Sequence, residues 1–284
     1  MIAPCSRPSV SRISLFGPKL QRIAFFLTLV LLSARTSVQA QSSGTAPAIA
    51  ESADAFSDVL SLARTSVQKM FEDIAGLSCT ETVTQSILDR FNRSMYEEHS
   101  VFNYRLEADG GDTSLHFAES RDVVQAPFRD PGRNLLMTDG FGSMLLVLHP
   151  AYMASFRFEA EGVENVAGTQ TVKFRFQEIP GAASLLMIRV AGRRYSVALR
   201  GTVWIERQRG VVMRLISRAD AGTKEFGIQS IVSEILYAPR DLESSGDTYW
   251  LPASAVIDVE TAKHHWQNVH HFAAYKQLQL SARP

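Results

Sequence analysis

The stretch from Gly201 to Arg218 constrains the fold more than any other part of the sequence. Val203 and Ile205 are separated by one residue, which is the period of a strand with one buried face. Gly210 can supply the positive φ that a short bulged turn requires. The same alternation resumes in Val211–Leu215. We therefore predict an antiparallel β-hairpin here.

Similar short runs fill most of the chain and are separated by single glycines, which is typical of an antiparallel meander. The sequence shows no repeat of fixed period and no linker rich in Pro, Gly or Ser. We therefore expect one domain over residues 47–284. Its other predicted strands are Leu77–Gln85, Val101–Glu107, Leu115–Val123, Phe156–Val166, Gln170–Ile179, Leu185–Val190, Tyr195–Glu206, Ile228–Tyr237, and a long last strand from Tyr249 toward Val259 and beyond.

Two segments have a helical period. From Ile49 to Ile74 the apolar residues recur at steps of three and four, which predicts an amphipathic helix. Residues 139–149 form a shorter helical pattern that is apolar nearly all round, as a buried helix would be. The fold class we expect is mainly β with helices (α+β), in which a meander curls into an unclosed β-barrel around the helix near 139–149.

The N-terminus has the three-part layout of a secretory signal peptide. Arg12, Lys19 and Arg22 precede the apolar run Ile23–Leu32, and a small-residue cleavage site ends at Ala40. The alternative of a membrane anchor is disfavoured because a spanning helix needs about 20 apolar residues. We expect residues 1–40 to be a signal peptide, 41–46 a disordered leader, and the mature protein to be periplasmic or secreted.

The charge and the cysteine content of the mature chain bear on its binding partners and on the source of its stability. Removing the five basic residues of the signal peptide leaves 24 basic and 29 acidic side chains, a net charge of −5. That balance gives no electrostatic case for nucleic-acid binding. Cys79 is then the only cysteine, so stability must come from packing, and its thiol is expected to be a small buried side chain.

The segment HHWQNVHH, from His264 to His271, is the most obvious candidate for chemistry. Metal ligands must converge on one point. On one strand His264 and His270 share a face but lie about 20 Å apart at ~3.3 Å per residue. We therefore expect no metal site and no cofactor. A metal-dependent or hydrolytic envelope enzyme that uses this strand remains the alternative, with Glu81, Glu119, Arg121, His264 and His270 as its polar site.

Charged residues also lie on strand faces that carry apolar ones. The threonines around Glu81 mark a solvent-facing side, which turns Glu81 toward the core. Glu119 and Arg121 either border a cavity or neutralise each other in an ion pair, and the pair is the favoured interpretation. Arginines are concentrated between residues 189 and 218 in an otherwise acidic protein. They fit solvated strand faces, or alternatively a surface for anionic lipid that includes Arg193, Arg194 and Arg200.

The C-terminal region resembles an uncharacterised family of exported bacterial envelope proteins. The matching residues are Tyr249–Ala253, Asp258–Thr261, His265–His270, Phe272 and Tyr275, together with Gly201–Glu206 and Cys79–Glu81. More distantly, the layout is similar to the half-open β-barrels of periplasmic lipoprotein-carrier, lipoprotein-receptor and sigma-regulator proteins. That resemblance implies a curved sheet that wraps apolar helices and holds acyl chains or lipidated peptides, without catalytic residues.

Together these observations predict an exported, non-catalytic binding protein. It would hold a lipid, a lipoprotein or another apolar envelope molecule on the concave face of the sheet. An envelope scaffold that binds a protein partner through a sheet edge is a further alternative. The side chains that we expect to line the site are Phe117, Phe141, Met144, Leu148 and Trp204.

Overall fold

The computed structural model describes residues 53–74, 76–109, 116–125, 140–182, 184–190, 193–219, 227–242 and 246–278. All of them belong to one compact unit, Ala50–Pro284. The predicted signal peptide with its cleavage after Ala40, the leader at 41–46 and the first residues of the predicted N-terminal helix lie outside the described residues.

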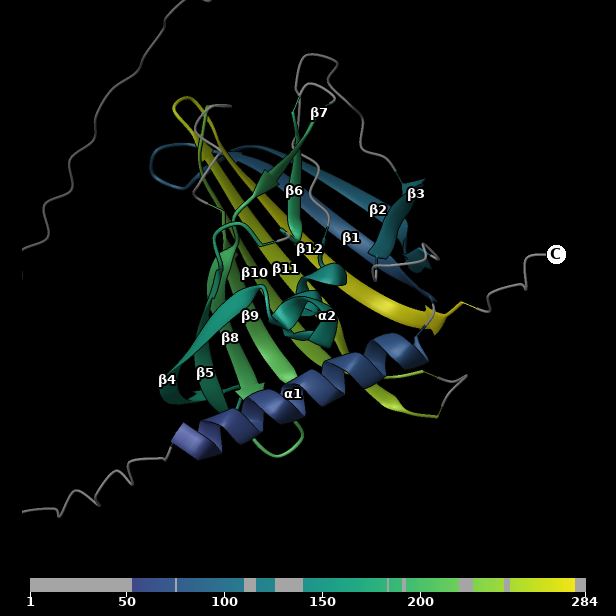
Figure 1. The fold of residues 1–284 in the computed structure, drawn as a ribbon. Helices are drawn as coiled ribbons and strands as arrows, with labels where there is room; N and C mark the ends of the chain where they lie inside the picture. Colours follow the sequence, from purple (N-terminus) through teal and green to yellow (C-terminus); the bar gives the residue numbers. More distant parts are fainter. Residues whose placement is uncertain are drawn as a thin grey trace, which may run out of the picture. The chain divides into compact units, whose positions relative to one another are not determined.

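A single ten-stranded antiparallel sheet dominates this unit, and it is not closed into a barrel (Figure 1). Its order is β3-β2-β1-β12-β11-β10-β9-β8-β5-β4, so β3 and β4 form the two edges. The predicted fold class, mainly β with an open curved sheet and a few helices, is confirmed. The strands are β1 (Gly76–Leu88), β2 (Ser94–Asp109), β3 (His116–Gln125), β4 (Phe156–Val166), β5 (Thr169–Glu178), β8 (Arg200–Glu206), β9 (Val212–Arg218), β10 (Ile228–Asp241), β11 (Thr248–Thr261) and β12 (His265–Gln277).

The strand order departs from a simple meander at two places. The last strand, β12, pairs with the first, β1, in the interior of the sheet, where Val83 lies opposite His270. The predicted strand Tyr195–Glu206 is broken at residues 198–199. Its first part, β7 (Arg193–Val197), forms a separate two-stranded sheet with β6 (Leu186–Val190). The predicted long last strand is likewise two strands, because the chain turns back between Thr261 and His265.

The predicted hairpin is present as β8 and β9, with Val203 opposite Leu215. Gly210 closes its turn with φ of 67°. A side chain at this position would collide with the N-terminal helix, since an added Cβ would lie 2.4 Å from the backbone carbonyl carbon of Leu62. Gly210 therefore serves the turn and also allows the helix to lie directly against it.

That helix, α1 (Ala53–Asp73), crosses one face of the sheet, below called the concave face (Figure 1). It contacts strand β8 and the short helical segment that follows β3. None of the described helices is both long and apolar enough to cross a membrane. The side chains of α1 that are buried on the concave face are Val59, Ala63, Val67 and Phe71.

The inner helix predicted near 139–149 is a 3-10 helix, η1 (Ser143–Leu148), followed by one turn of α-helix, α2 (Pro150–Met153). His149 separates them, and its Nδ1 accepts a hydrogen bond from the Ala151 amide at 3.2 Å. Residues Leu145 to Leu148 are all buried, as expected of a segment that is apolar on every side. The segment lies on the path of the chain from edge strand β3 to edge strand β4, and it packs into the core on the concave face.

Candidate functional site

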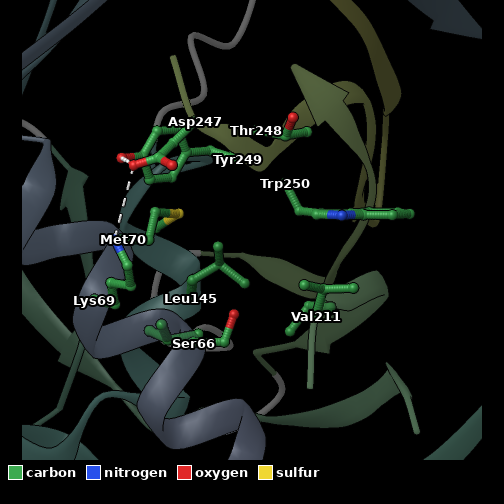
Figure 2. Close-up of a pocket in the computed structure, with 11 residues that line it drawn as sticks. Ser66, Lys69, Met70, Leu145, Val211, Asp247, Thr248, Tyr249 and Trp250 are labelled. Atoms are coloured by element: carbon green, nitrogen blue, oxygen red, sulfur yellow. Dashed lines mark hydrogen bonds and ion pairs between the residues drawn. The ribbon is translucent and has the colours of Figure 1, made fainter. Parts of the chain in front are cut away.

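A pocket of about 160 Å³ opens between α1 and the strands beneath it (Figure 2). Its interior is mainly apolar. Met70 of α1 and Leu145 of η1 lie at its centre, and Trp250 of β11 lies on the opposite side. We call it the α1 pocket. Its other lining residues are Ser66, Val67, Lys69, Val211, Val212, Asp247, Thr248 and Tyr249.

A second and smaller space of about 20 Å³ lies next to the α1 pocket. Met70 and Leu145 line both spaces. The smaller one, called the inner pocket below, is also bordered by Gly142, where a side chain would lie 2.7 Å from Cδ2 of Leu106. The two pockets thus share two flexible or branched aliphatic side chains and the covering helix. The remaining lining residues of the inner pocket are Phe71, Ile74, Leu77, Tyr104, Leu106, Leu251, Pro252 and Tyr275.

Charged and hydroxyl groups surround the mouth of the α1 pocket. Lys69 forms an ion pair with Asp73 one turn along α1, and its Nζ lies 3.9 Å from a carboxylate oxygen of Asp247. The hydrogen bond with Asp73 raises the pKa of Lys69. The Tyr249 hydroxyl is within hydrogen-bond distance of both carboxylates, at 3.1 Å from Asp73 and 3.3 Å from Asp247. The C-terminal end of α1 is therefore held to β11 by polar contacts.

Four of the five predicted lining residues pack on the concave face, but none of the five lines either pocket. Phe141 and Leu148 are buried in the core, whereas Met144 and Phe117 are partly buried against it. The Phe117 ring packs 4.6 Å from that of Phe71 in α1. These side chains therefore lie beneath or beside the covering helices, and they remain a predicted binding surface.

Trp204 has different surroundings from its neighbours in β8. Val203 and Ile205 belong to the core cluster of the concave face, and Trp204 does not. Its Nε1 donates a hydrogen bond to Glu164 at 3.0 Å, and the guanidinium of Arg214 lies 4.6 Å from its ring centroid. Since adjacent residues of a strand point to opposite faces, Trp204 packs on the convex side.

The polar residues that the sequence singled out meet in the core near the other edge of the sheet. Glu81 of β1 has 0% exposure and receives two hydrogen bonds from Arg121 of β3, at 2.5 and 2.9 Å. His270 of β12 lies 2.8 Å from the same carboxylate. The orientation of Glu81 toward the core agrees with the sequence, but the ion pair described for Arg121 is with Glu81 rather than with Glu119.

The charges of this cluster balance. Burial alone would raise the pKa of Glu81, but hydrogen bonds from His270 and Arg121 outweigh burial and lower it. Burial lowers the pKa of His270 despite the opposing effect of Glu81, so the imidazole is neutral at pH 7. Because an ionised Glu81 can only accept, Nδ1 of His270 donates. The Phe141 ring packs against the imidazole, with 4.5 Å between the two ring centroids.

Glu119 fixes the start of the inner helical segment. Its carboxylate accepts hydrogen bonds from the Gly140 amide at 2.7 Å and from the Ser143 hydroxyl at 3.1 Å. Burial, reinforced by the charge of Glu119, raises the pKa of Tyr104 well above its usual value. Edge strand β3 therefore anchors both the buried cluster and the segment that packs into the sheet.

The remaining predicted residues lie elsewhere. His264 is exposed in the turn before β12, with its ring 5.2 Å from that of Trp266, so it does not meet His270. Arg193 and Arg194 belong to β7 and Arg200 begins β8. Within the part of the chain that the structure describes, no group of three or more His, Cys, Asp or Glu side chains is arranged to hold a metal ion. Cys79 is buried, and burial raises the pKa of its thiol to about 12.

Sequence reasoning missed the residues that line the two pockets. Met70 was recognised only as part of the helix stripe, and Leu145 only as part of an apolar run. Tyr249 and Trp250 enter the sequence analysis only as the start of the predicted last strand and as part of the family resemblance. The apolar pattern of α1 and β11 does not indicate which side chains border a pocket. A pocket depends on how well side chains from distant parts of the chain fill the space between them.

No protein-family model matches the sequence, and no curated protein matches it. Among solved structures, a DUF1329 family protein from Desulfovibrio piger has 11% identity and a TM-score of 0.44, and the match covers 79% of this chain and 94% of that chain. An outer membrane lipoprotein-sorting protein domain from Vibrio parahaemolyticus has 10% identity and a TM-score of 0.40, with 78% and 94% covered. A LolA superfamily protein from Nitrosomonas europaea has 8% identity and a TM-score of 0.38, with 77% and 94% covered. The chain is similar to each of these proteins over more than three quarters of its length.

Proposed function

We propose that this protein is an exported, non-catalytic binder of an apolar or amphiphilic envelope molecule, a lipid or the acyl chains of a lipoprotein. The guest would lie on the concave face of the sheet, beneath α1. The observation that carries this proposal is the pair of apolar pockets on either side of Met70 and Leu145. Both pockets are covered by α1, and the larger one is open at its rim.

The guest has to displace side chains, because sites for small molecules usually have volumes of about 300–1,000 Å³. The α1 pocket has about 160 Å³ and the inner pocket about 20 Å³. Met70 has three rotatable side-chain bonds, so it can change its conformation at a small energetic cost. A shift of Met70 and Leu145 would join the two pockets and lengthen the cavity toward Phe71 and Leu77.

The contacts of α1 indicate how the cavity would grow further. The C-terminal turn is held by Asp73, which accepts from Tyr249 and whose backbone oxygen accepts from Gln277 at 3.0 Å. The middle of the helix rests on the hairpin turn at Gly210, where Leu62 and Ala63 touch it. Apolar contacts of this kind are not directional, so α1 can pivot about its Asp73 end while the sheet remains intact.

Displacing α1 and the inner segment would expose the predicted lining residues. Phe117 packs against Phe71 of α1, and Met144 and Leu148 belong to the inner segment itself. Phe141 would bound the cavity on the side of the Glu81 cluster. In the open form these four side chains would contact the guest, and the arginines predicted to meet an anionic head group remain Arg193, Arg194 and Arg200.

The test is binding of a fluorescent fatty acid by the purified protein, with lipid extraction and native mass spectrometry of co-purified molecules. Met70→Trp adds volume at the point shared by both pockets and should weaken fatty-acid binding about tenfold, because it fills the space that the guest requires. Val163→Trp is the matched control, because Val163 is an exposed residue of β4 outside both pockets. Absence of any bound amphiphile, or equal effects of the two tryptophans, would contradict the proposal.

A further inference from the structure

The solvent-exposed turn between β1 and β2 is held by several hydrogen bonds to one carboxylate. The Asp89 carboxylate accepts hydrogen bonds from the Phe91 amide at 2.8 Å and the Arg93 amide at 3.0 Å. It also accepts two from the Arg93 guanidinium, at 2.8 and 2.6 Å. These contacts lower the pKa of Asp89, so the turn is held by an ionised carboxylate at neutral pH. Its side chains are therefore presented in a defined arrangement.

Two large apolar side chains are exposed at this end of the hairpin, Phe91 in the turn and Met95 near the start of β2. Phe91 and Met95 are each 63% exposed. The guanidinium carbons of Arg90 and Arg93 lie 4.8 and 5.2 Å from the centroid of the Phe91 ring. Single exposed apolar residues are common on protein surfaces. An exposed aromatic ring that two arginine guanidinium groups approach, at the same end of the hairpin as an exposed methionine, is a more specific arrangement.

The adjacent turn adds charge of the same sign. Leu88 at the end of β1 pairs with His265 at the start of β12, so the turn that contains Lys263 and His264 lies next to the β1–β2 turn. Lys263 and His264 are both exposed. Together the two turns carry Arg90, Arg93 and Lys263 against the carboxylate of Asp89. We call this end of the sheet the basic tip.

We propose that the basic tip docks on the surface of a bilayer that contains anionic phospholipid. Phe91 and Met95 would enter the boundary between head groups and acyl chains, and Arg90 and Lys263 would contact phosphate groups. A lipid surface fits better than a protein partner. A stable protein interface buries about 800 Å² on each side, whereas two side chains on a turn offer only a small insertion point.

The first test measures binding to phosphatidylglycerol-containing vesicles by co-sedimentation. Phe91→Ser combined with Met95→Ser should weaken binding about tenfold, because apolar surface no longer leaves water. Arg90→Gln should weaken binding about fivefold, and only to anionic vesicles. Val123→Ser combined with Val124→Ser is the matched control, since these β3 side chains are equally exposed at 60% and 67%. All variants should keep the wild-type thermal midpoint.

The second test reports on one side chain at a time, by the fluorescence of a tryptophan placed there. The N-terminal segment is the same in all variants, so it cannot cause a difference between them. Phe91→Trp should become strongly quenched by vesicles that carry brominated acyl chains, whereas Val124→Trp should not exceed the quenching of the native tryptophans. Equal quenching of the two variants would overturn the proposal, as would equal binding of the two serine pairs. Fatty-acid binding without vesicles should be unaffected by the tip variants, so failure here is distinct from failure of the proposed guest site.

Discussion

The two flanks of the concave face are filled in different ways. Toward edge strand β3, Glu81, Arg121 and His270 are joined by short hydrogen bonds, and Phe141 packs over them. Under α1, Met70 and Leu145 meet through apolar surface and leave pockets on both sides. Hydrogen bonds between buried charged groups fix one geometry, whereas apolar contacts tolerate rearrangement. The difference indicates which flank stays rigid and which can open.

The rigid flank also contains Glu81 and His270, two residues of the alternative function, a metal-dependent or hydrolytic enzyme. Glu81 and His270 have side-chain exposures of 0% and 3%, and neither lines a described pocket. A general acid or base has to come within hydrogen-bond reach of its substrate. In this conformation the cluster stabilises the sheet, and the space available to a guest lies in the other flank.

Removal of Glu81 should have the largest effect on stability. Glu81→Ala leaves the Arg121 guanidinium buried without its partner, and loss of one member of a buried pair typically costs about 3–5 kcal/mol. Urea unfolding followed by circular dichroism measures the change. Glu161→Ala is the control, since it removes a solvent-exposed carboxylate that lies 3.5 Å from Lys173 and should cost less than about 1 kcal/mol. Similar costs for the two variants would contradict the contrast between the flanks.

A smaller effect is expected where α1 meets the hairpin. Gly210→Ala pays about 1–2 kcal/mol for its positive φ and about 1–3 kcal/mol for overpacking against the backbone of Leu62 and Ala63. Gly168→Ala is the control that measures the cost of the positive φ alone, because Gly168 has φ of 82° and no atom lies within 4 Å of the added carbon. Hydrogen exchange should accelerate in α1 for Gly210→Ala alone. Unchanged exchange in α1 would show that the contact with Gly210 does not hold the middle of the helix.

The smallest effect is a dependence on pH. Folding lowers the pKa of His270, so the unfolded chain binds more protons as the pH falls below about 6.5, and stability should decrease with acidification there. The lowered pKa of Glu81 adds a further loss below its unfolded value. His270→Asn should remove the first of these decreases in a series of urea melts between pH 8 and 5. His264→Asn, which removes an imidazole from an exposed turn rather than from the core, is the control variant.

The sequence was most informative where neighbours along the chain determine the structure. The alternation around Val203 and the glycine at 210 predicted the β8–β9 hairpin, and the apolar run at 144–148 predicted a buried helical segment. The pairing of β1 with β12 was not predicted, because it joins segments separated by about 190 residues. The Glu81–Arg121 pair was missed for the same reason, since it links β1 and β3 through their positions in the sheet.

The position of β12 between β1 and β11 has a consequence for how the chain matures. Strands β1, β2 and β3 join the rest of the sheet only through β12, which lies near the end of the chain. The β1–β2 hairpin can therefore join the rest of the sheet only after nearly all later residues have been synthesised. Closure of so long a loop is slow, so β1 stays exposed to proteases and aggregation in the meantime. A polypeptide that stops before His265 would therefore leave one edge of β1 unpaired, although β1 would still pair with β2 on its other edge.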